Sequence, residues 1–299
     1  MNLRALLLFV MLTSLVKAQD VKESTFKKGK LKLNNSVILD DKLRETSGLI
    51  HWNSKLWTHN DDTDTNLYAL DTVSGAILET YSLEGVVNKD WEEIAQDDEY
   101  LYIGDFGNNA TGDRKDLQIV KVEKQSLLMR KPSIGYIKFA YEDQKDFSIN
   151  KPNTTNFDCE AFIVVQDSLF LFTKEWKSKK TTVYKLPNRV GDFAAEKGKS
   201  YNTKGLVTGA SYYPSKKILA LCGYTRNGKP FIELFYNFKG TDFFSGSHKK
   251  IKIKSRFLQI EAITTKDGKN YYLTNEELKF GPIHKSQQIH KLDLSDFLK

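Results

Sequence analysis

Five copies of one short pattern run along this chain and limit the folds that are open to it. Each copy has a short polar start, an apolar run, a turn rich in Asp, Asn, Ser, Gly or Lys, and a second apolar run that ends in polar residues. The copies are marked by Glu45, Glu92, Glu160, Thr208 and Glu261, which lie 47, 68, 48 and 53 residues apart. Periods in this range with several short strands per unit are typical of a β-propeller.

Further alternating runs complete each unit. The third runs are NLYALDT, LQIVKVEK, TTVYKLPN, FIELFYNF and QIHKLDLS, and most copies carry a weaker fourth run. The last copy lacks a fourth run, whereas residues 29–39 contain a strand without a sheet, and pairing the two would close the ring and cover both edges. We therefore predict an all-β fold, a β-propeller of five blades with four antiparallel strands each, closed by an N-terminal strand. Six blades are the alternative if the long second copy contains another blade.

The first residues have the pattern of a secretory signal. A basic start is followed by an apolar stretch and by Ala18, a small residue suited to cleavage, so we expect residues 1–18 to be a signal peptide. Residues 19–299 then form a single propeller domain. No later segment approaches the ~20 apolar residues of a membrane span. We expect a secreted or periplasmic protein that is a monomer.

Charge and cysteine usage exclude some classes of partner. The formal net charge is +7, and basic residues cluster at 177–180 and 248–256. Such runs usually lie at solvated strand edges or in loops, and here they lack the interleaved aromatic residues of a nucleic-acid site, so we expect no nucleic-acid partner. Cys159 and Cys222 are too few for a disulfide scaffold, and a single bridge between them remains open.

The repeated acidic positions indicate a site. The first strand of each propeller blade lies innermost, so the five marker residues, four of them carboxylates, are expected to form a ring around the channel. A second ring is expected at the ends of the second strands, from Asn60, Asp105, Glu175, Gly223 and Glu276. Crowded carboxylates raise one another's pKa or require a counter-cation, although acids that only bond backbone amides are the plainer alternative.

Oxygen donors at variable angles favour Ca²⁺, and no His or Cys pair has zinc spacing. The predicted metal ligands are Glu45, Asn60, Glu92, Asp105, Glu160, Glu261 and Glu276. As candidate catalytic acids or bases we name Asp90, Asp105, Glu175 and His59, with Lys174 and Arg114 as cations for an anionic substrate. The sequence has no G-x-S-x-G, H-E-x-x-H or phosphate-cradling motif.

The motifs ETSGL, THND, DWEEIA, GDFGNN, DCEAF, IEAI and TNEE together resemble the exported propellers grouped as phytase-like or SdiA-regulated proteins. The resemblance covers most of residues 19–299. It extends distantly to the calcium-binding propellers of the gluconolactonase, paraoxonase and apyrase kinds. Those families imply a metal set beneath an open face, which here corresponds to Glu45, Asn60, Asp105, Glu160 and Glu261. Thr208 and Gly223 depart from both rings.

Two functions are compatible with this pattern. One is a calcium-dependent hydrolase of a phosphoester, ester or lactone at the channel mouth. The other is a binding or scaffold propeller that holds a small molecule, glycan, peptide or partner protein, with Trp52, Trp91 or Trp176 as sugar platforms. Propellers host both functions, so the fold cannot decide between them.

Overall fold

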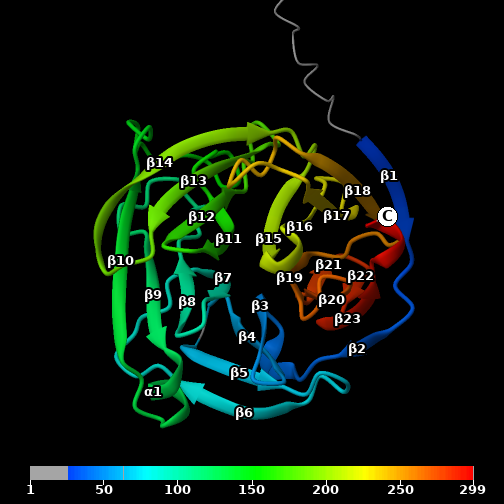
Figure 1. Ribbon diagram of the computed structural model, residues 1–299, viewed down its shortest axis with the longest axis horizontal. Coiled ribbons are helices and arrows are strands. Elements are labelled where there is room, and N and C mark those ends of the chain that lie inside the picture. Colours follow the sequence, from blue (N-terminus) through cyan, green and yellow to red (C-terminus); the bar gives the residue numbers. More distant parts are fainter. Residues whose placement is uncertain (1–25, 63, 299) are drawn as a thin grey trace, which may run out of the picture.

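The computed structural model describes residues 26–62 and 64–298, and the segment predicted as a signal peptide lies outside them. Within these residues the strands form five four-stranded antiparallel units around one axis (Figure 1), which confirms the predicted all-β propeller. The first unit comprises β3 (Thr46–Trp52), β4 (Lys55–Asn60), β5 (Asn66–Leu70) and β6 (Ile77–Ser82). The second comprises β7 (Trp91–Gln96), β8 (Tyr100–Asp105), β9 (Gln118–Glu123) and β10 (Ile134–Tyr141).

The other three units repeat this plan. The third comprises β11 (Cys159–Val165), β12 (Ser168–Thr173), β13 (Thr181–Pro187) and β14 (Gly191–Tyr201). The fourth comprises β15 (Leu206–Tyr213), β16 (Ile218–Tyr224), β17 (Pro230–Tyr236) and β18 (Ser247–Ile253). The fifth comprises β19 (Ile260–Thr265), β20 (Asn270–Asn275), β23 (Gln288–Asp293) and β2 (Ser36–Ile38). The first strand of each unit lies innermost in Figure 1.

The predicted N-terminal strand is in fact two strands with different partners. β2 pairs antiparallel with β23 and supplies the fourth strand of the last blade, as predicted. Residues 29–31 instead belong to β1 (Phe26–Leu31), which pairs in parallel with β18 and covers the edge of the fourth blade. The N-terminal segment therefore covers two adjacent blades.

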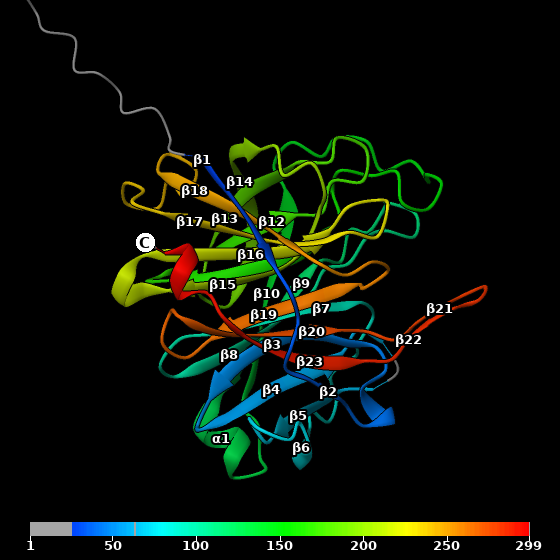
Figure 2. The same cartoon turned by 90° about the vertical axis from the view of Figure 1, so that its right-hand side faces the viewer.

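The long second copy contains no extra blade in the part that the structure describes. Its added residues form the short helix α1 (Lys124–Leu128), the long strand β10 and a loop over 142–158. β10 pairs in parallel with β14, which joins the second and third blades into one eight-stranded sheet. A small hairpin of β21 (Leu278–Phe280) and β22 (Ile283–Lys285) projects beyond the body of the molecule between β20 and β23 (Figure 2).

Apolar side chains pack between neighbouring blades. Five clusters of buried residues fill the five blade interfaces; Phe162 and Ile119, for example, lie between the second and third blades, and Leu221 and Phe172 between the third and fourth. Each such buried side chain contributes about 1.5–3 kcal/mol relative to exposure. The two cysteines are buried and are not joined to each other. No helix among the described residues is long and apolar enough to span a membrane.

One acidic side chain ties the inner strands together at the centre. Glu93 of β7 is fully buried, and its carboxylate accepts backbone hydrogen bonds from Leu49 (3.2 Å), Ile94 (3.1 Å) and Ala210 (2.9 Å), which belong to three blades. The equivalent residues of the other inner strands are small, namely Gly48, Ala161, Gly209 and Ala262. A Cβ atom at Gly209 would lie 2.6 Å from the Glu261 carbonyl, so the close approach of these strands requires small residues.

Candidate functional site

A β-bulge near the start of the inner strands sets the register of the site. The pairing with the second strand skips a residue between Trp91 and Glu93, and does so at the same place in the third, fourth and fifth blades. The extra residue is left out of the ladder, which re-aims its side chain. The extra residues are Glu92, Glu160, Thr208 and Glu261, as the expected ring required.

In the first blade the ring position belongs to Ser47 and not to Glu45. Thr46 pairs with Asn60 as Trp91 pairs with Asp105, which makes Ser47 the counterpart of Glu92. The Ser47 hydroxyl donates to the Glu92 backbone carbonyl (2.6 Å), and the Thr208 hydroxyl donates likewise to the Ile260 carbonyl. The ring therefore has three carboxylates and two hydroxyl groups that tie neighbouring blades.

Glu45 belongs to a neighbouring layer of residues that directly precede the inner strands. The backbone carbonyls of Glu45, Asp158 and Gln259 accept hydrogen bonds from the residues that follow the second strands. The donors are Asp61 (3.0 Å), Lys174 (2.8 Å) and Glu276 (3.3 Å) respectively. Ionisable side chains from this layer and from the bulges thus meet at one mouth of the channel.

A buried cluster forms the deeper part of the mouth. One carboxylate oxygen from each of Glu92, Asp158 and Glu160 lies within 4.8 Å of the others. Asp158 accepts from the Asn108 backbone N–H and from Trp176 Nε1, both at 2.7 Å. Burial is the main cause that raises the pKa of all three carboxyls, and for Glu92 the nearby Glu160 charge adds to it. The carboxylates therefore resist ionising together without added positive charge.

A half-buried cluster forms the outer part. Glu45, Asp61 and Glu276 also bring one oxygen each within 4.8 Å. Burial, followed by neighbouring carboxylates, raises the pKa of Asp61 to about 8 and that of Glu276 to about 7. Asp61 Oδ1 is buried and has no hydrogen-bond partner among the described residues. A buried oxygen without a hydrogen-bond partner lowers the stability of the fold. A cation bound to this oxygen would take the place of the missing partner.

Two further acids, Glu261 and Asp90, connect the two clusters into one continuous group of carboxylates, which we call the acidic belt. The pKa of Glu261 is raised well above its usual range by burial and then by Glu276, and the Glu261 charge in turn acts on Glu160. Burial also raises the pKa of Asp90 to about 6, with Asp158 adding to the shift. A Cβ atom at Gly107 would lie within 2.3 Å of oxygens of both Asp90 and Glu92, so only glycine lets the backbone pass there.

Positive charge at the mouth is scarce. Lys174 is buried and pairs with Glu160, and its ammonium group lies 5.0 Å from the Trp176 ring centre and 5.5 Å from that of Tyr224. Its pKa is raised because the carboxylates, Glu160 first, outweigh the opposing effect of burial. Lys174 is the buried amine among eight carboxylates and acts on six of them, while Arg114 also acts on Asp90 and the exposed Lys279 acts on Glu45. The eight carboxylates are Glu45, Asp61, Asp90, Glu92, Asp158, Glu160, Glu261 and Glu276.

The remaining candidate residues have other surroundings. Arg114 pairs with Asp105 (2.9 Å) and donates to the Gly107 carbonyl (2.8 Å), so both side chains brace the loop after β8. Glu175 accepts from Thr173, Ser178 and Thr182 and lies outside the belt.

Two candidates from the first blade are also held in the interior. His59 is fully buried and packs edge-on against Trp91 (5.6 Å between ring centres), and burial lowers its pKa to about 4. Asn60 donates to the Lys42 carbonyl (2.8 Å) and to Asp64 (3.0 Å), and its Oδ1 has no partner among the described residues.

Sequence reasoning did not assign roles to Asp61, Asp158 or Glu93. Asp61 and Asp158 follow or precede the strands by one residue, and their registers depend on bulges that the sequence alone does not locate. Asp158 stands in the same DxE spacing as Asp90 and Glu92, and that recurrence was the available signal.

A groove of about 900 Å³ adjoins the mouth. Trp176, Tyr224 and Gln259 border both the groove and the acidic belt. Phe257 and Phe280 also line the groove, and Phe280 belongs to β21 of the β21–β22 hairpin, which projects from the body of the molecule (Figure 2). Of the three tryptophans considered as sugar platforms, Trp91 is fully buried and Trp52 stacks on Trp57 (4.7 Å), so Trp176 is the one at the groove.

No protein-family model matches the chain, and no curated protein sequence matches it. Among solved structures, the chain is similar to the WD40 repeats of RRP9, with 9% identity over 86% of this chain and 97% of that chain and a TM-score of 0.44. It is also similar to a chain of the mitotic checkpoint complex, with 10% identity over 96% of this chain and 100% of that chain and a TM-score of 0.41. We base no functional argument on these likenesses.

Proposed function

We propose that the channel mouth binds a divalent cation, Ca²⁺, and that the chain is a binding propeller whose ligand lies in the adjoining groove. The observation that carries this proposal is the belt of eight carboxylates around a single buried amine. Hard oxygen donors in irregular geometry suit Ca²⁺ better than Mg²⁺, which requires a near-octahedral set. The same proposal includes export to a calcium-rich compartment, as expected from residues 1–18. The calcium concentration there would fill even a site of low affinity.

The donor set fits the ion at two depths. Glu92, Asp158 and Glu160 would hold it at the buried cluster, and Glu45, Asp61 and Glu276 at the half-buried cluster. The unpartnered Asp61 Oδ1 favours the outer position. Bound Ca²⁺ would supply positive charge and vacant coordination positions next to Trp176, which suits a polar ligand such as a glycan.

Calorimetric titration of Ca²⁺ into the metal-free protein tests the cation site. We expect saturable binding that raises Tm and that Asp61→Asn and Glu276→Gln, which change ligands of the favoured outer cluster, each weaken by at least tenfold. Glu99→Gln removes one exposed carboxylate in the β7–β8 turn, at the end of the inner strand opposite the mouth, and is the matched control, with affinity expected within twofold of the parent. Equal affinity in all four proteins would contradict the proposal.

Hydrolysis is a second candidate, because the pKa of Asp90 is raised to about 6 at the edge of the belt. A carboxyl that titrates near neutral pH is suited to general acid or base work on a phosphoester, ester or lactone. If this function holds, the protein with Ca²⁺ hydrolyses bis(p-nitrophenyl) phosphate or a simple lactone, and Asp90→Asn lowers kcat by 10²-fold or more. If no turnover is observed, or if Asp90→Asn does not change it, the result excludes hydrolysis at this site and favours the binding propeller. The resemblance to phytase-like or SdiA-regulated propellers supports both functions without choosing between them.

A further inference from the structure

A second cavity, distinct from the channel, lies between the third and fourth blades. It has a volume of about 930 Å³. The floor is the face of β17 and β18 that carries Glu233 and Lys250, and Tyr201 at the end of β14 forms one wall. Loops over 202–205, 225–229 and 253–256 surround the opening. This volume lies within the range of sites for small molecules.

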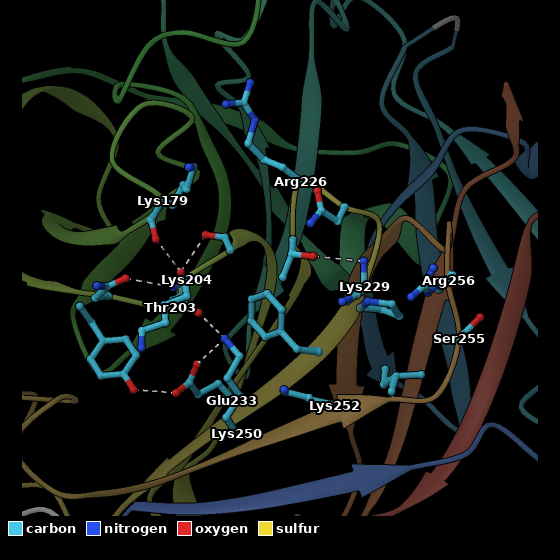
Figure 3. Close-up of a pocket in the computed structure, with 18 of the residues that line it drawn as sticks. Lys179, Thr203, Lys204, Arg226, Lys229, Glu233, Lys250, Lys252, Ser255 and Arg256 are labelled. Atoms are coloured by element: carbon cyan, nitrogen blue, oxygen red, sulfur yellow. Dashed lines mark hydrogen bonds and ion pairs between the residues drawn. The ribbon is translucent and has the colours of Figure 1, made fainter.

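The alternation of β18 places its basic residues on the cavity. Its sequence SHKKIKI puts Ile251 and Ile253 into the apolar cluster behind the sheet, so His248, Lys250 and Lys252 point the other way. The two basic runs that the sequence presented as solvated edges meet here, because Lys179 of the third blade lines the same cavity as β18 of the neighbouring fourth blade. Figure 3 shows Lys179 and Lys204 on one side of the hollow and Lys229 and Arg256 on the other.

Positive charge in the cavity is almost uncompensated. The lining contains seven cationic side chains and one carboxylate: Lys179, Lys204, Arg226, Lys229, Lys250, Lys252 and Arg256, with Glu233. Glu233 is buried, accepts from the Tyr201 hydroxyl (2.6 Å) and pairs with Lys250 (3.3 Å). Lys250 also donates to the Thr203 carbonyl and covers the Phe231 ring at 3.7 Å. The other six cations form no ion pair with any residue in 26–62 or 64–298.

We infer that this cavity binds a small polyanion, a ligand that carries two or more phosphate or sulfate groups. Six exposed cations without an ion pair, from the third and fourth blades, surround one hollow and concentrate positive potential there, which attracts anions. Lys250 is held in place by Glu233 and gives the floor a fixed donor, whereas Arg226 and Arg256 offer planar forks that match phosphate or sulfate oxygens. Lys250 covers the Phe231 ring, and the Tyr201 ring packs against Phe235 and Phe244, which disfavours base stacking on either ring.

Calorimetric titration with inorganic tripolyphosphate and with sucrose octasulfate tests the inference in metal-free buffer. We expect micromolar binding of at least one probe at 50 mM salt and a tenfold or greater loss of affinity at 200 mM salt. Tighter binding of tripolyphosphate assigns phosphate groups to the ligand, and tighter binding of sucrose octasulfate assigns sulfate groups. The absence of Ca²⁺ keeps the channel mouth out of the measurement, so the result is independent of the proposed cation site.

Matched charge variants distinguish binding of the polyanion at this cavity from nonspecific electrostatic attraction to the protein surface. Lys204→Gln/Lys229→Gln/Lys252→Gln removes three cavity cations, and Lys131→Gln/Lys151→Gln/Lys216→Gln removes three exposed lysines elsewhere. We expect the first triple variant to lose at least tenfold in affinity and the second less than twofold. Failure of both probes to bind, or an equal loss in the two variants, would overturn the inference.

Discussion

The acidic channel mouth and the basic cavity lie on one small propeller but concentrate opposite charge in different ways. The mouth gathers buried and half-buried carboxylates from the starts of the inner strands and the ends of the second strands. Burial raises the pKa of every one, and repulsion between carboxylates adds to the shift in all but Asp158. The cavity gathers exposed cations from irregular loops and from one outer strand. Buried like charges cost stability in the fold, whereas solvated ones cost little. The mouth is therefore a site built into the core, and the cavity is a site added at the surface.

Removing the Glu93 carboxylate, which accepts three backbone hydrogen bonds at the centre of the propeller, should have the largest effect on stability. We expect Glu93→Ala to lower the free energy of unfolding by about 3–5 kcal/mol, because it leaves three buried backbone N–H groups without an acceptor. Urea unfolding measures this change. Glu93→Gln retains an acceptor oxygen and should lose less than half as much. A loss below about 1 kcal/mol in Glu93→Ala would show that water replaces the carboxylate.

Breaking the only ion pair of the acidic belt comes next. Lys174→Met leaves Glu160 buried beside other carboxylates, and we expect a loss of about 3–5 kcal/mol in unfolding free energy. The double variant Lys174→Met/Glu160→Gln removes both charges and should recover at least half of that loss. Additive effects in this double-mutant cycle would mean that the pair is not coupled.

The comparison also shows what a sequence of this kind can predict. The propeller, its four-strand units and the ring positions of Glu92, Glu160 and Glu261 follow from a repeat that recurs along the whole chain, whereas the bulges at those positions do not. Glu45 was placed two residues out of register because the first copy has Ser47 at the ring position, and only the pairing of Thr46 with Asn60 reveals it. A repeat fixes equivalent positions only where each copy has the same spacing.

The basic cavity could not be predicted, for a different reason. Residues 177–180 and 248–256 lie far apart in the chain and look like ordinary solvated runs. They meet because the third and fourth blades are neighbours, so that Lys179 of the third blade lines the same cavity as the outer strands of the fourth. A contact of this kind between blades has no local sequence signature.

Bound cation should cancel the pH dependence that the mouth has in its absence. In the cation-free protein, the raised pKa values of Asp61 (about 8) and Glu276 (about 7) mean that the folded state binds more protons than the unfolded state. The free energy of unfolding should therefore fall as pH rises from about 4 through 8. Since Ca²⁺ replaces these protons, its affinity should rise up to about tenfold per pH unit for each proton released. Tm from pH 5 to pH 8, with and without Ca²⁺, measures both trends, and parallel curves would contradict the proposed site.

Neutralising one carboxylate of the outer cluster should stabilise the cation-free fold. We expect Glu276→Gln to raise the free energy of unfolding by about 1 kcal/mol without Ca²⁺, because it removes repulsion with Glu45 and Glu261, and to reduce the stabilisation by Ca²⁺. Urea unfolding with and without Ca²⁺ gives both quantities. A destabilised cation-free variant would assign Glu276 a structural role, as for Glu93.

The smallest effect on stability is expected in the basic cavity. Lys204, Lys229 and Lys252 are exposed and form no ion pair with the residues that the structure describes, so their triple replacement by Gln should change the free energy of unfolding by no more than about 0.5 kcal/mol. Thermal and urea unfolding without ligand measure this. A stability near that of the parent, together with a loss of polyanion binding, would set the cavity apart from the mouth, where charge and stability are linked. A large loss would instead mean that these lysines hold the third and fourth blades together, and the contrast between the two regions would not hold.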